Sequence, residues 1–345
     1  MDVPAKKAVV LISGGLDSTL AAKIMLEQGV HVVGVYLSAP WGCCDKTKAM
    51  KVARQLGIEF LVIKLTQEYI QVIRKPKYGY GSSMNPCVDC RIYMFHKAKE
   101  VMAEVGASFI VTGEVVSQRP MSQMRGALKI IETDSGLHRL IVRPLSAQVL
   151  PATIPEEQGL VDRSKMYGII GRSRKPQMEL ALKYGILDYP NAAGGCLLTD
   201  QEFGNRVRDL FLHQEKIDLD DMELLRVGRH FRVNDRTKLI VGRNEAENTT
   251  LTEYLGPGGL LFVAEEFPGP SILLQGPPDA ESRQLALGLM NHYSRPEKRP
   301  FGARVTCRVG MPVHPEGGFP QVPLLEEKIF LGENVTQEQI EKMKI

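Results

Sequence analysis

Small, hydroxylated and acidic residues follow an apolar segment near the start of the chain. Residues 8–12 read Ala-Val-Val-Leu-Ile, and residues 13–19 read Ser-Gly-Gly-Leu-Asp-Ser-Thr. Paired glycines between a buried strand and a helix let the backbone turn sharply, so that N–H groups and hydroxyls can contact a phosphate at the helix N-terminus. An ordinary glycine turn is the alternative, but the preceding strand, the hydroxyls and the carboxylate favour a nucleotide site. The predicted nucleotide-binding residues here are Ser13, Gly14, Gly15, Asp17, Ser18 and Thr19.

The spacing of this segment differs from that of the commoner phosphate-binding loops. It contains neither Gly-x-x-x-x-Gly-Lys-Ser/Thr nor Gly-x-Gly-x-x-Gly. It resembles instead the Ser-Gly-Gly-x-Asp-Ser fingerprint of the PP-loop ATP pyrophosphatases. That resemblance implies an enzyme that cleaves ATP between its α and β phosphates, places AMP on a carbonyl oxygen and lets a nucleophile displace it.

Length and composition set broad limits on the class of protein. A chain of 345 residues with 43% hydrophobic and 24% charged residues predicts a globular protein of about two domains. The formal charge of +3 is too small to establish a nucleic-acid partner by itself. Because no stretch of 18 apolar residues and no signal-like start occurs, we expect a cytoplasmic protein without a membrane partner. In that compartment, the six cysteines favour thiols or metal ligands over disulfides.

Strand-like and helix-like segments alternate through the first 150 residues. The predicted strands are 7–13, 31–37, 59–64 and 108–112, and the predicted helices are 16–28, 47–56 and 91–105. The helices are followed by the expected caps Gly29, Gly57 and Gly106. This order predicts an α/β fold with a doubly wound, mainly parallel sheet, which forms an ATP-binding domain over residues 1–150.

Ligands of doubly wound sheets bind beyond the carboxyl ends of the strands. The Ser13 loop, the segment after Tyr36-Leu37 and the segment Thr112-Gly113-Glu114 should therefore line one pocket. We predict Leu37 and Gly113 as further nucleotide contacts. A plain turn explains Thr112-Gly113 equally well.

Two further sections follow the predicted sheet domain. Residues 151–215 form a predicted basic helical linker, in which cations gather between residues 163 and 183. These cations could steer a polyphosphate or a nucleic-acid backbone, although solvated helix faces explain them as well. Residues 216–345 predict a smaller α+β domain with strands at 224–227, 238–241 and 260–263, a surface loop at 265–278 and a helix at 280–292.

Cysteines from two distant turns form the second chemical motif. Cys87-Val88-Asp89-Cys90 precedes a helix expected to begin near Arg91, and Cys196 lies in a glycine turn. Thiols at a helix N-terminus have a lowered pKa and can bind a metal or attack an electrophile. Three thiolates can hold three irons of a [4Fe-4S] cluster and leave the fourth open. Zinc completed by His96 or another group, and a redox dithiol with Cys196 merely buried, remain open as alternatives.

The other cysteines and His96 carry less information. Cys43 and Cys44 are adjacent and cannot easily chelate one ion together, so they are either a buried pair or a relay for sulfur. Cys307 lies in the strand-like run 303–309 and is expected in the core. We leave His96 out of the predicted metal set.

At this point residues 7–215 resemble one branch of the PP-loop group, the tRNA-uridine thiolases, which include the 4-thiouridine synthases and 2-thiouridylases. The resemblance rests on residues 13–18, Asn85-Pro86-Cys87-Val88-Asp89-Cys90, Thr112-Gly113-Glu114 with Ser117-Gln118, and Gly195-Cys196. It implies that Asp17 places Mg²⁺ while a uridine oxygen attacks the α-phosphorus of ATP. It also implies that Cys87, Cys90 and Cys196 act in catalysis and hold a [4Fe-4S] cluster, so that sulfide or a persulfide replaces AMP.

The resemblance leaves the choice of RNA open. The chain starts almost at the nucleotide loop, so we expect no amino-terminal RNA-binding extension, and its third section is not the barrel pair of the 2-thiouridylases. Instead, residues 238–244 and 248–251 resemble the RNA-binding domain of NFACT-type ribosome-associated proteins. The arginines before them could contact phosphates or merely solubilise a strand edge. They are Arg226, Arg229, Arg232 and Arg236.

Together these features predict an ATP-dependent tRNA sulfurtransferase that releases AMP and pyrophosphate. Its expected partners are tRNA and either sulfide or a sulfur carrier, with a homodimer left open. Two alternatives remain. One is a PP-loop ligase or amidotransferase-like enzyme with structural zinc, and the other is a non-catalytic RNA-binding protein that responds to nucleotide.

Overall fold

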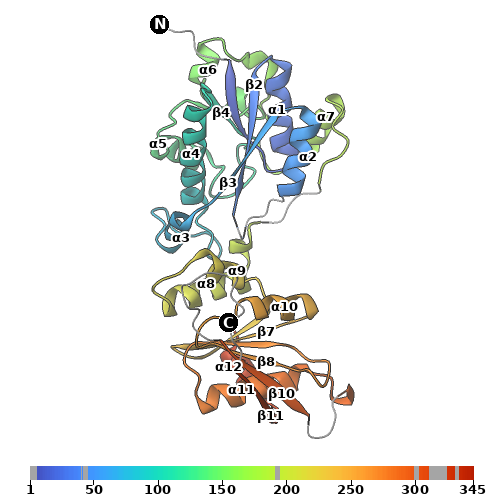
Figure 1. The fold of residues 1–345 in the computed structure, drawn as a ribbon. Helices are drawn as coiled ribbons and strands as arrows, with labels where there is room; N and C mark the ends of the chain where they lie inside the picture. The colour runs from blue at the N-terminus through green and yellow to red at the C-terminus, as the bar shows by residue number, and fades with distance from the viewer. Residues whose placement is uncertain are drawn as a thin grey trace. The chain divides into compact units, whose positions relative to one another are not determined.

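The chain folds into two compact units in a computed structural model that describes residues 6–39, 41, 46–190, 195–298, 303–310, 325–330 and 334–345. Unit 1 comprises residues 1–204 and unit 2 comprises residues 205–345. Each unit has its own sheet and its own apolar core (Figure 1). The finer division at residues 150 and 215 stays a prediction.

Unit 1 is built on a five-stranded parallel sheet with the strand order β3-β2-β1-β4-β5. The strands are β1 (Lys7–Leu11), β2 (His31–Ser38), β3 (Glu59–Lys64), β4 (Phe109–Val111) and β5 (Ile141–Val142). Chain order reverses between β1 and β4, so the ligand crevice of this fold opens at their carboxyl ends. The predicted doubly wound α/β class is confirmed.

Helices cover both faces of this sheet (Figure 1). The helices of unit 1 are α1 (Leu16–Glu27), α2 (Lys46–Leu56), α3 (Gln67–Arg74), α4 (Cys87–Glu104), α5 (Arg125–Asp134), α6 (Ile154–Glu157) and α7 (Lys175–Lys183). Because side chains alternate along a strand, Ala8 and Val10 of β1 pack in the core with α1 and α7. Val9 and Leu11 pack on the other face with α4 and α5.

The helix ends predicted from glycines in unit 1 are confirmed, and one helix start differs from the prediction. Gly29, Gly57 and Gly106 have φ of 70°, 66° and 64°, as expected of glycines that end helices. The helix predicted from Arg91 begins four residues earlier, at Cys87. Pro86 stands just before its first turn, where a missing N–H leaves nothing unpaired, and its carbonyl accepts from Cys90 N at 2.8 Å.

Unit 2 contains a six-stranded antiparallel sheet with the strand order β11-β10-β8-β9-β7-β6. Its strands are β6 (Arg229–Asn234), β7 (Thr237–Val241), β8 (Leu260–Val263), β9 (Ile272–Gln275), β10 (Arg304–Val309) and β11 (Leu325–Phe330). Its helices are α9 (Leu219–Leu224), α10 (Glu245–Glu253), α11 (Ala280–Tyr293) and α12 (Gln337–Met343), and α8 (Gln201–His213) runs into it from unit 1. The predicted α+β character is confirmed.

Two predictions in unit 2 are wrong. Residues 224–227 are the end of α9 and a turn, because Asp218 and Asp221 cap this short helix reciprocally. The predicted loop 265–278 contains β9, whose apolar residues are buried in the middle of the sheet despite the flanking Pro and Gly. Cys307 is 1% exposed in β10, as expected of a core residue.

Candidate functional site

The Ser13 loop is held by its own hydroxyls at the carboxyl end of β1. Ser13 Oγ lies 3.1 Å from Ser18 Oγ, and the Ser18 and Thr19 hydroxyls donate to the Gly15 carbonyl at 2.9 and 3.0 Å. Gly14 has φ of +79°, and a Cβ there would lie 2.8 Å from the Ala49 nitrogen on α2. This backbone position therefore requires glycine.

Asp17 lies in the first turn of α1, directly after this loop. Its Oδ2 accepts from Gln118 Nε2 at 3.0 Å, whereas its Oδ1 is shielded from solvent and has no hydrogen-bond partner among the described residues. Burial raises the pKa of Asp17 from its usual value, and the side chains of Gln118, Arg174, Arg119 and Gln177 oppose that rise. A shielded carboxylate oxygen without a partner is suited to receive a ligand.

The segment after β4 lies against the same helix turn. A Cβ on Gly113 would lie 2.4 Å from the carbonyl carbon of Asp17, so the two backbones touch at this point. The structure thus brings Gly113 together with the Ser13 loop, as predicted. The role of Gln118 in binding Asp17 was not foreseen, although Ser117-Gln118 belongs to the quoted motif.

Each of the three predicted site cysteines makes a side-chain contact with a neighbouring segment. Cys87 and Cys90 occupy the first turn of α4, where Cys87 Sγ accepts from Asn85 Nδ2 at 3.1 Å and Cys90 Sγ from Tyr69 Oη at 2.8 Å. Cys196 Sγ donates to the Trp41 carbonyl at 3.4 Å. Burial raises the pKa of Tyr69 well above its usual range, and both Cys90 and Cys196 raise it further. Both cysteines therefore lie within electrostatic range of one hydroxyl.

The loop after β4 contacts both the nucleotide loop and the cysteine turn. At one end Gln118 donates to Asp17, and a few residues later Met121 Sδ accepts from Asn85 Nδ2 at 3.9 Å. The same Asn85 amide donates to Cys87. One loop therefore contacts both motifs identified in the sequence, through Gln118 at one motif and through Met121 at the other.

A buried ion pair holds this loop to the cysteine-bearing helix. Glu114, 2% exposed, lies 3.1 Å from Arg143 Nε and 3.5 Å from Arg91 Nε on α4. Arg143 also pairs with Glu132. Removing one member of such a buried network would leave a charge without compensation, so these residues fix the position of the loop.

Other predicted site residues are placed as follows. Leu37 lies in β2 beside Ile63 and packs in the core on the α4 side, and its contact with nucleotide stays a prediction. His96 is exposed on α4. Cys43 and Cys44 lie outside the described residues. Within the described ranges, no three His, Cys, Asp or Glu side chains form a group that could hold a metal ion, so the metal role of Cys87, Cys90 and Cys196 stays a prediction.

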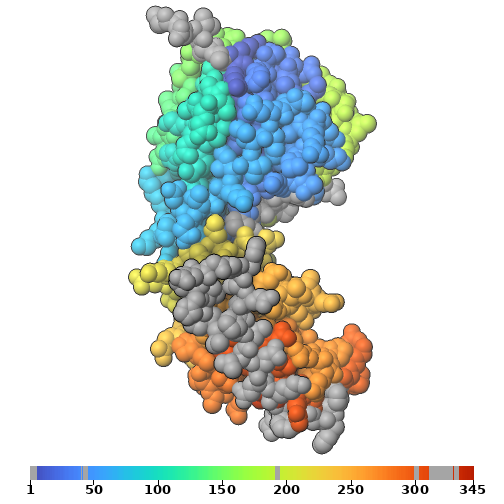
Figure 2. All heavy atoms as spheres, in the orientation of Figure 1, coloured from blue at the N-terminus to red at the C-terminus, as the bar shows by residue number. Residues whose placement is uncertain are grey.

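Part of the basic run in 163–183 is engaged within the fold. Arg163 Nη1 lies 3.0 Å from Glu156, and Lys183 lies over the rings of Tyr167 and Tyr184. The segment that contains α7 forms part of the surface of unit 1 (Figure 2). Arg174, at the N-cap of α7, acts on Asp17 electrostatically.

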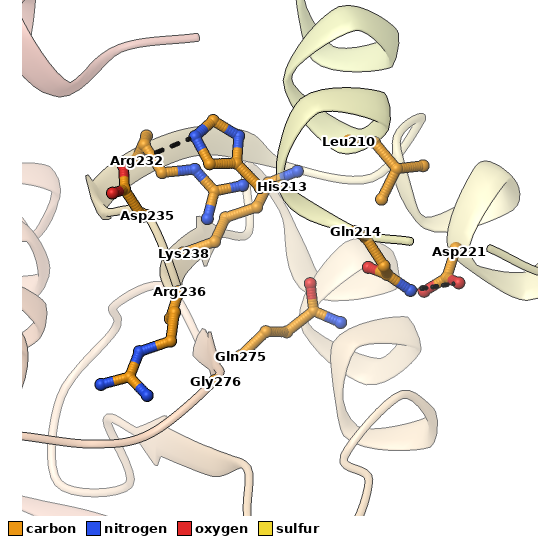
Figure 3. Close-up of a pocket in the computed structure, with 10 residues that line it drawn as sticks. All are labelled: Leu210, His213, Gln214, Asp221, Arg232, Asp235, Arg236, Lys238, Gln275 and Gly276. Atoms are coloured by element: carbon orange, nitrogen blue, oxygen red, sulfur yellow. Dashed lines mark hydrogen bonds and ion pairs between the residues drawn. The ribbon is translucent and has the colours of Figure 1, made fainter. Parts of the chain in front are cut away.

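Unit 2 has a cavity of about 230 Å³ between α8 and the β6–β7 hairpin (Figure 3). Its lining residues are Leu210, His213, Gln214, Asp221, Arg232, Asp235, Arg236, Lys238, Gln275 and Gly276. Beside it, Asp209 receives Arg232 at 2.6 Å and Lys238 at 3.6 Å. Burial lowers the pKa of Lys238 to about 8, although Asp209 opposes that change.

The arginines predicted to contact phosphates differ in their surroundings. Arg232 is committed to Asp209, and Arg229 lies 4.6 Å from the centre of the Tyr293 ring. Arg236 is exposed at the rim of the cavity. Their contact with RNA stays a prediction.

No helix in the described part of the chain is long and apolar enough to cross a membrane.

Two different family models match this chain, one in each unit. Residues 4–148 match the family model "Thiamine biosynthesis protein (ThiI)", and residues 228–314 match "NFACT protein RNA binding domain". The tRNA-specific 2-thiouridylase MnmA of Clostridium acetobutylicum is 34% identical over 125 residues, which are 31% of this chain and 35% of that protein. The same-named protein of Petrotoga mobilis is 23% identical over 312 residues, which cover 84% and 80% of the two chains.

Among solved structures, a 4-thiouridine synthetase in complex with RNA and bound ATP is 22% identical. The likeness has a TM-score of 0.33 and covers 52% of each chain. Across three of the curated relatives, this chain spans 35%, 56% and 34% of their own length. The two resemblances seen in the sequence are confirmed: residues 4–148 match the ThiI model of the PP-loop group, and residues 228–314 match the model of the RNA-binding domain of NFACT proteins.

Proposed function

We propose that this chain is an ATP-dependent sulfurtransferase that replaces a uridine oxygen of tRNA with sulfur. The proposal depends on the loop after β4, which contacts both motifs. Gln118 of this loop donates to Asp17 at the nucleotide loop. Met121 of the same loop accepts from Asn85, which also donates to Cys87. Activation of a carbonyl and delivery of sulfur must occur at one carbon, so the two groups must share a site. The names of the thiouridylase relatives and the RNA-binding match support the same substrate class.

In the first step the Ser13 loop binds the phosphates of ATP. Its hydroxyls and backbone N–H groups lie at the N-terminus of α1, where the helix favours anionic ligands. Asp17, with one oxygen held by Gln118, would place Mg²⁺ on the pyrophosphate with the other. The uridine carbonyl oxygen attacks the α-phosphorus, the bond to the β-phosphate oxygen breaks, and pyrophosphate leaves.

In the second step a sulfur nucleophile attacks the activated carbon, AMP departs with the former carbonyl oxygen, and a thiocarbonyl remains. Cys87, Cys90 and Cys196 would hold a [4Fe-4S] cluster, which when bound supplies an open iron position for sulfide. The donor set fits such a group, because three thiols are soft ligands that suit iron and sulfide, and because Cys90 and Cys196 both act electrostatically on the Tyr69 hydroxyl. A persulfide on one of these cysteines would attack the same carbon with its outer sulfur and displace AMP. A second cysteine thiolate would then attack the inner sulfur, which releases the thiocarbonyl and leaves a disulfide that an external thiol reduces.

The second unit would bind the RNA. Its match to an RNA-binding domain favours RNA as the sulfur acceptor. The family model that matches residues 4–148 is named after thiamine biosynthesis, whose acceptor would be a small molecule, and the match in unit 2 favours RNA over that acceptor. The PP-loop ligase with structural zinc and the non-catalytic RNA-binding protein are the functions to be distinguished from this one.

Anaerobic purification with iron and sulfide analysis, followed by assays of pyrophosphate release and thionucleoside formation on tRNA, tests the proposal. We expect Cys196→Ala to keep pyrophosphate release and to lose thiolation, because only the sulfur step needs this residue. Cys307→Ala, in the core of unit 2, is the matched control and should keep both. Unchanged thiolation in the Cys196 variant, or no pyrophosphate release by the wild-type chain with tRNA, would contradict the proposal.

A further inference from the structure

Two like charges lie side by side in the wall of the cavity in unit 2. Arg232 on β6 and Lys238 on β7 occupy directly opposite positions of the hairpin, and both line the cavity (Figure 3). The neighbouring pair, Phe231 and Leu239, is buried in the core on the other face of the sheet. Cations that lie opposite each other on paired strands repel, so this arrangement destabilises the hairpin unless an anion compensates it.

Asp209 on α8 compensates only part of this charge. Its two carboxylate oxygens accept from Arg232 Nε at 2.9 Å and Nη2 at 2.6 Å. Lys238 Nζ lies 3.6 Å from the same carboxylate, and the described residues give this ammonium no other ion pair. Because Lys238 is only 5% exposed, water solvates its charge poorly. One carboxylate therefore serves two buried cations.

The other charged groups near Lys238 do not restore the balance. Asp221 caps α9, and Asp235 is fully exposed in the hairpin turn. Burial lowers the pKa of Lys238 to about 8 and Asp209 opposes that change, whereas Arg232 and Arg206 add to it. The remaining titratable or charged groups that act on Lys238 or line the cavity are His213, His230 and Arg236. The described residues thus leave the base of the cavity one negative charge short.

The missing charge and the size of the cavity indicate the chemistry of the ligand. A phosphate group is an anion with several acceptor oxygens, and a lysine ammonium binds it as a point charge with three donors. Pockets for drug-sized ligands measure about 300–1,000 Å³, so a cavity of about 230 Å³ suits one such group. Lys238 and Arg236 lie within residues 228–314, which match an RNA-binding domain, and this match favours RNA as the source of the phosphate.

We propose that this cavity binds one phosphate group of RNA against Lys238, while Arg236 at its rim attracts the adjoining RNA backbone. The inference rests on the proposed function and names the phosphate contact of its RNA-binding unit. Asp209 is a positioning residue, because it holds both Arg232 and Lys238 in place. An internal phosphodiester and a terminal phosphate of tRNA share this chemistry, and neither contact reads the base sequence.

The test measures the affinity of the full chain for tRNA by fluorescence anisotropy over a range of salt concentrations. Lys238→Met keeps an unbranched side chain in the cavity and leaves the ion pair of Asp209 and Arg232 intact, so the fold should persist. We expect this variant to bind tRNA about tenfold more weakly, the effect of one hydrogen bond to a charged group. The slope of log K against log salt should also fall by about one, which a purely structural role would not cause.

Two further variants complete the series. Arg236→Gln changes an exposed residue of the turn and should weaken binding by about threefold, because water and salt screen an exposed charge. Lys342→Gln is the matched control, since it removes an exposed cation from α12, which packs on the Phe231 face of the sheet. It should bind tRNA as wild type does.

The pH dependence and the state of the RNA end sharpen the result. Bound phosphate favours the protonated ammonium, so wild-type affinity should fall as pH rises from 7 to 9, and Lys238→Met should show a smaller fall. Removal of the 5′-phosphate from tRNA should abolish the difference between wild type and Lys238→Met when the cavity holds the terminal group. The difference should persist when the cavity holds an internal phosphodiester, and either result supports the inference.

Wild-type affinity and salt slope in Lys238→Met, with tRNA thiolation retained, would overturn the inference and leave the proposed function standing. Hydrogen exchange of the β6 and β7 amides reports whether Lys238→Met is folded. With that variant unfolded, unchanged affinity in Arg236→Gln would overturn the inference instead. A wild-type chain that neither binds nor thiolates tRNA would overturn the proposed function and the inference with it.

Discussion

Each unit contains a shielded carboxylate, and the two differ in how far neighbouring groups compensate the negative charge. Asp17 in unit 1 accepts a hydrogen bond from Gln118 at 3.0 Å, has no ion pair among the described residues, and has an Oδ1 that is shielded from solvent. Asp209 in unit 2 is 8% exposed and accepts from Arg232 Nε at 2.9 Å and Nη2 at 2.6 Å, with Lys238 Nζ at 3.6 Å. The pKa of Asp17 is raised, whereas that of Asp209 is lowered because its ion pairs outweigh the effect of burial.

This difference suggests that Asp17 binds a ligand and that Asp209 stabilises the fold. Folding leaves the Asp17 charge poorly compensated, which is useful only where a cation or another ligand completes the site. Folding fully compensates Asp209, which therefore joins α8 to the β6–β7 hairpin. Substituting each residue should have opposite consequences, one for activity and the other for stability.

The largest effect is expected for Asp17→Asn. The amide keeps the shape and the contact with Gln118 but removes the charge that would place Mg²⁺, so pyrophosphate release should fall by about a thousandfold. Because the folded pKa of Asp17 is raised, its ionised form is disfavoured by folding at neutral pH. The free energy of unfolding should then stay equal or rise. A variant that unfolds more readily than wild type would place Asp17 in the same class as Asp209.

The opposite result is expected for Asp209→Asn, which leaves Arg232 and Lys238 without their acceptor. The free energy of unfolding of unit 2 should fall by about 3 kcal/mol. Urea unfolding of the full chain, followed by hydrogen exchange of β6 and β7 amides, measures it. Asp235→Asn, fully exposed at the rim of the cavity, is the control and should leave stability unchanged.

The effect of Asp209 should depend on pH with a definite sign. A carboxylate whose folded pKa is depressed contributes stability that is fully present above its unfolded pKa of about 3.9 and is lost as pH falls through the lower folded value. The stability gap between wild type and Asp209→Asn should persist at pH 5 and close below about pH 4. A gap that stays constant down to pH 2 would mean that Asp209 does not act through its charge.

The same contrast shows what could be predicted from the sequence. The strands of unit 1 and the closeness of Gly113 to the Ser13 loop follow from apolar runs, glycine caps and the topology of parallel sheets. β9 was missed because Pro and Gly flank its short apolar run, and only pairing with β7 and β8 makes it a strand.

Side-chain contacts of the site could not be predicted in the same way. Gln118 reaches Asp17 across 101 residues of sequence, and Tyr69 reaches Cys90 across 21. Both contacts depend on the path of a loop or a short helix that no periodicity specifies. The cysteines were recognisable by type and spacing, whereas the tyrosine and tryptophan beside them carried no signal of their own.

The smallest effect is expected when the hydrogen bond from Gln118 to Asp17 is removed. Gln118→Leu should lower pyrophosphate release about tenfold, the value of one hydrogen bond to a carboxylate. Because this bond lowers the pKa of Asp17, its loss should also move the acid limb of the pH–rate profile to higher pH. Gln158→Leu, at the exposed end of α6, is the matched control. Equal rates and an unmoved acid limb in Gln118→Leu would mean that Asp17 titrates independently of the loop after β4, and the link between the nucleotide loop and the cysteine turn would lose its functional meaning.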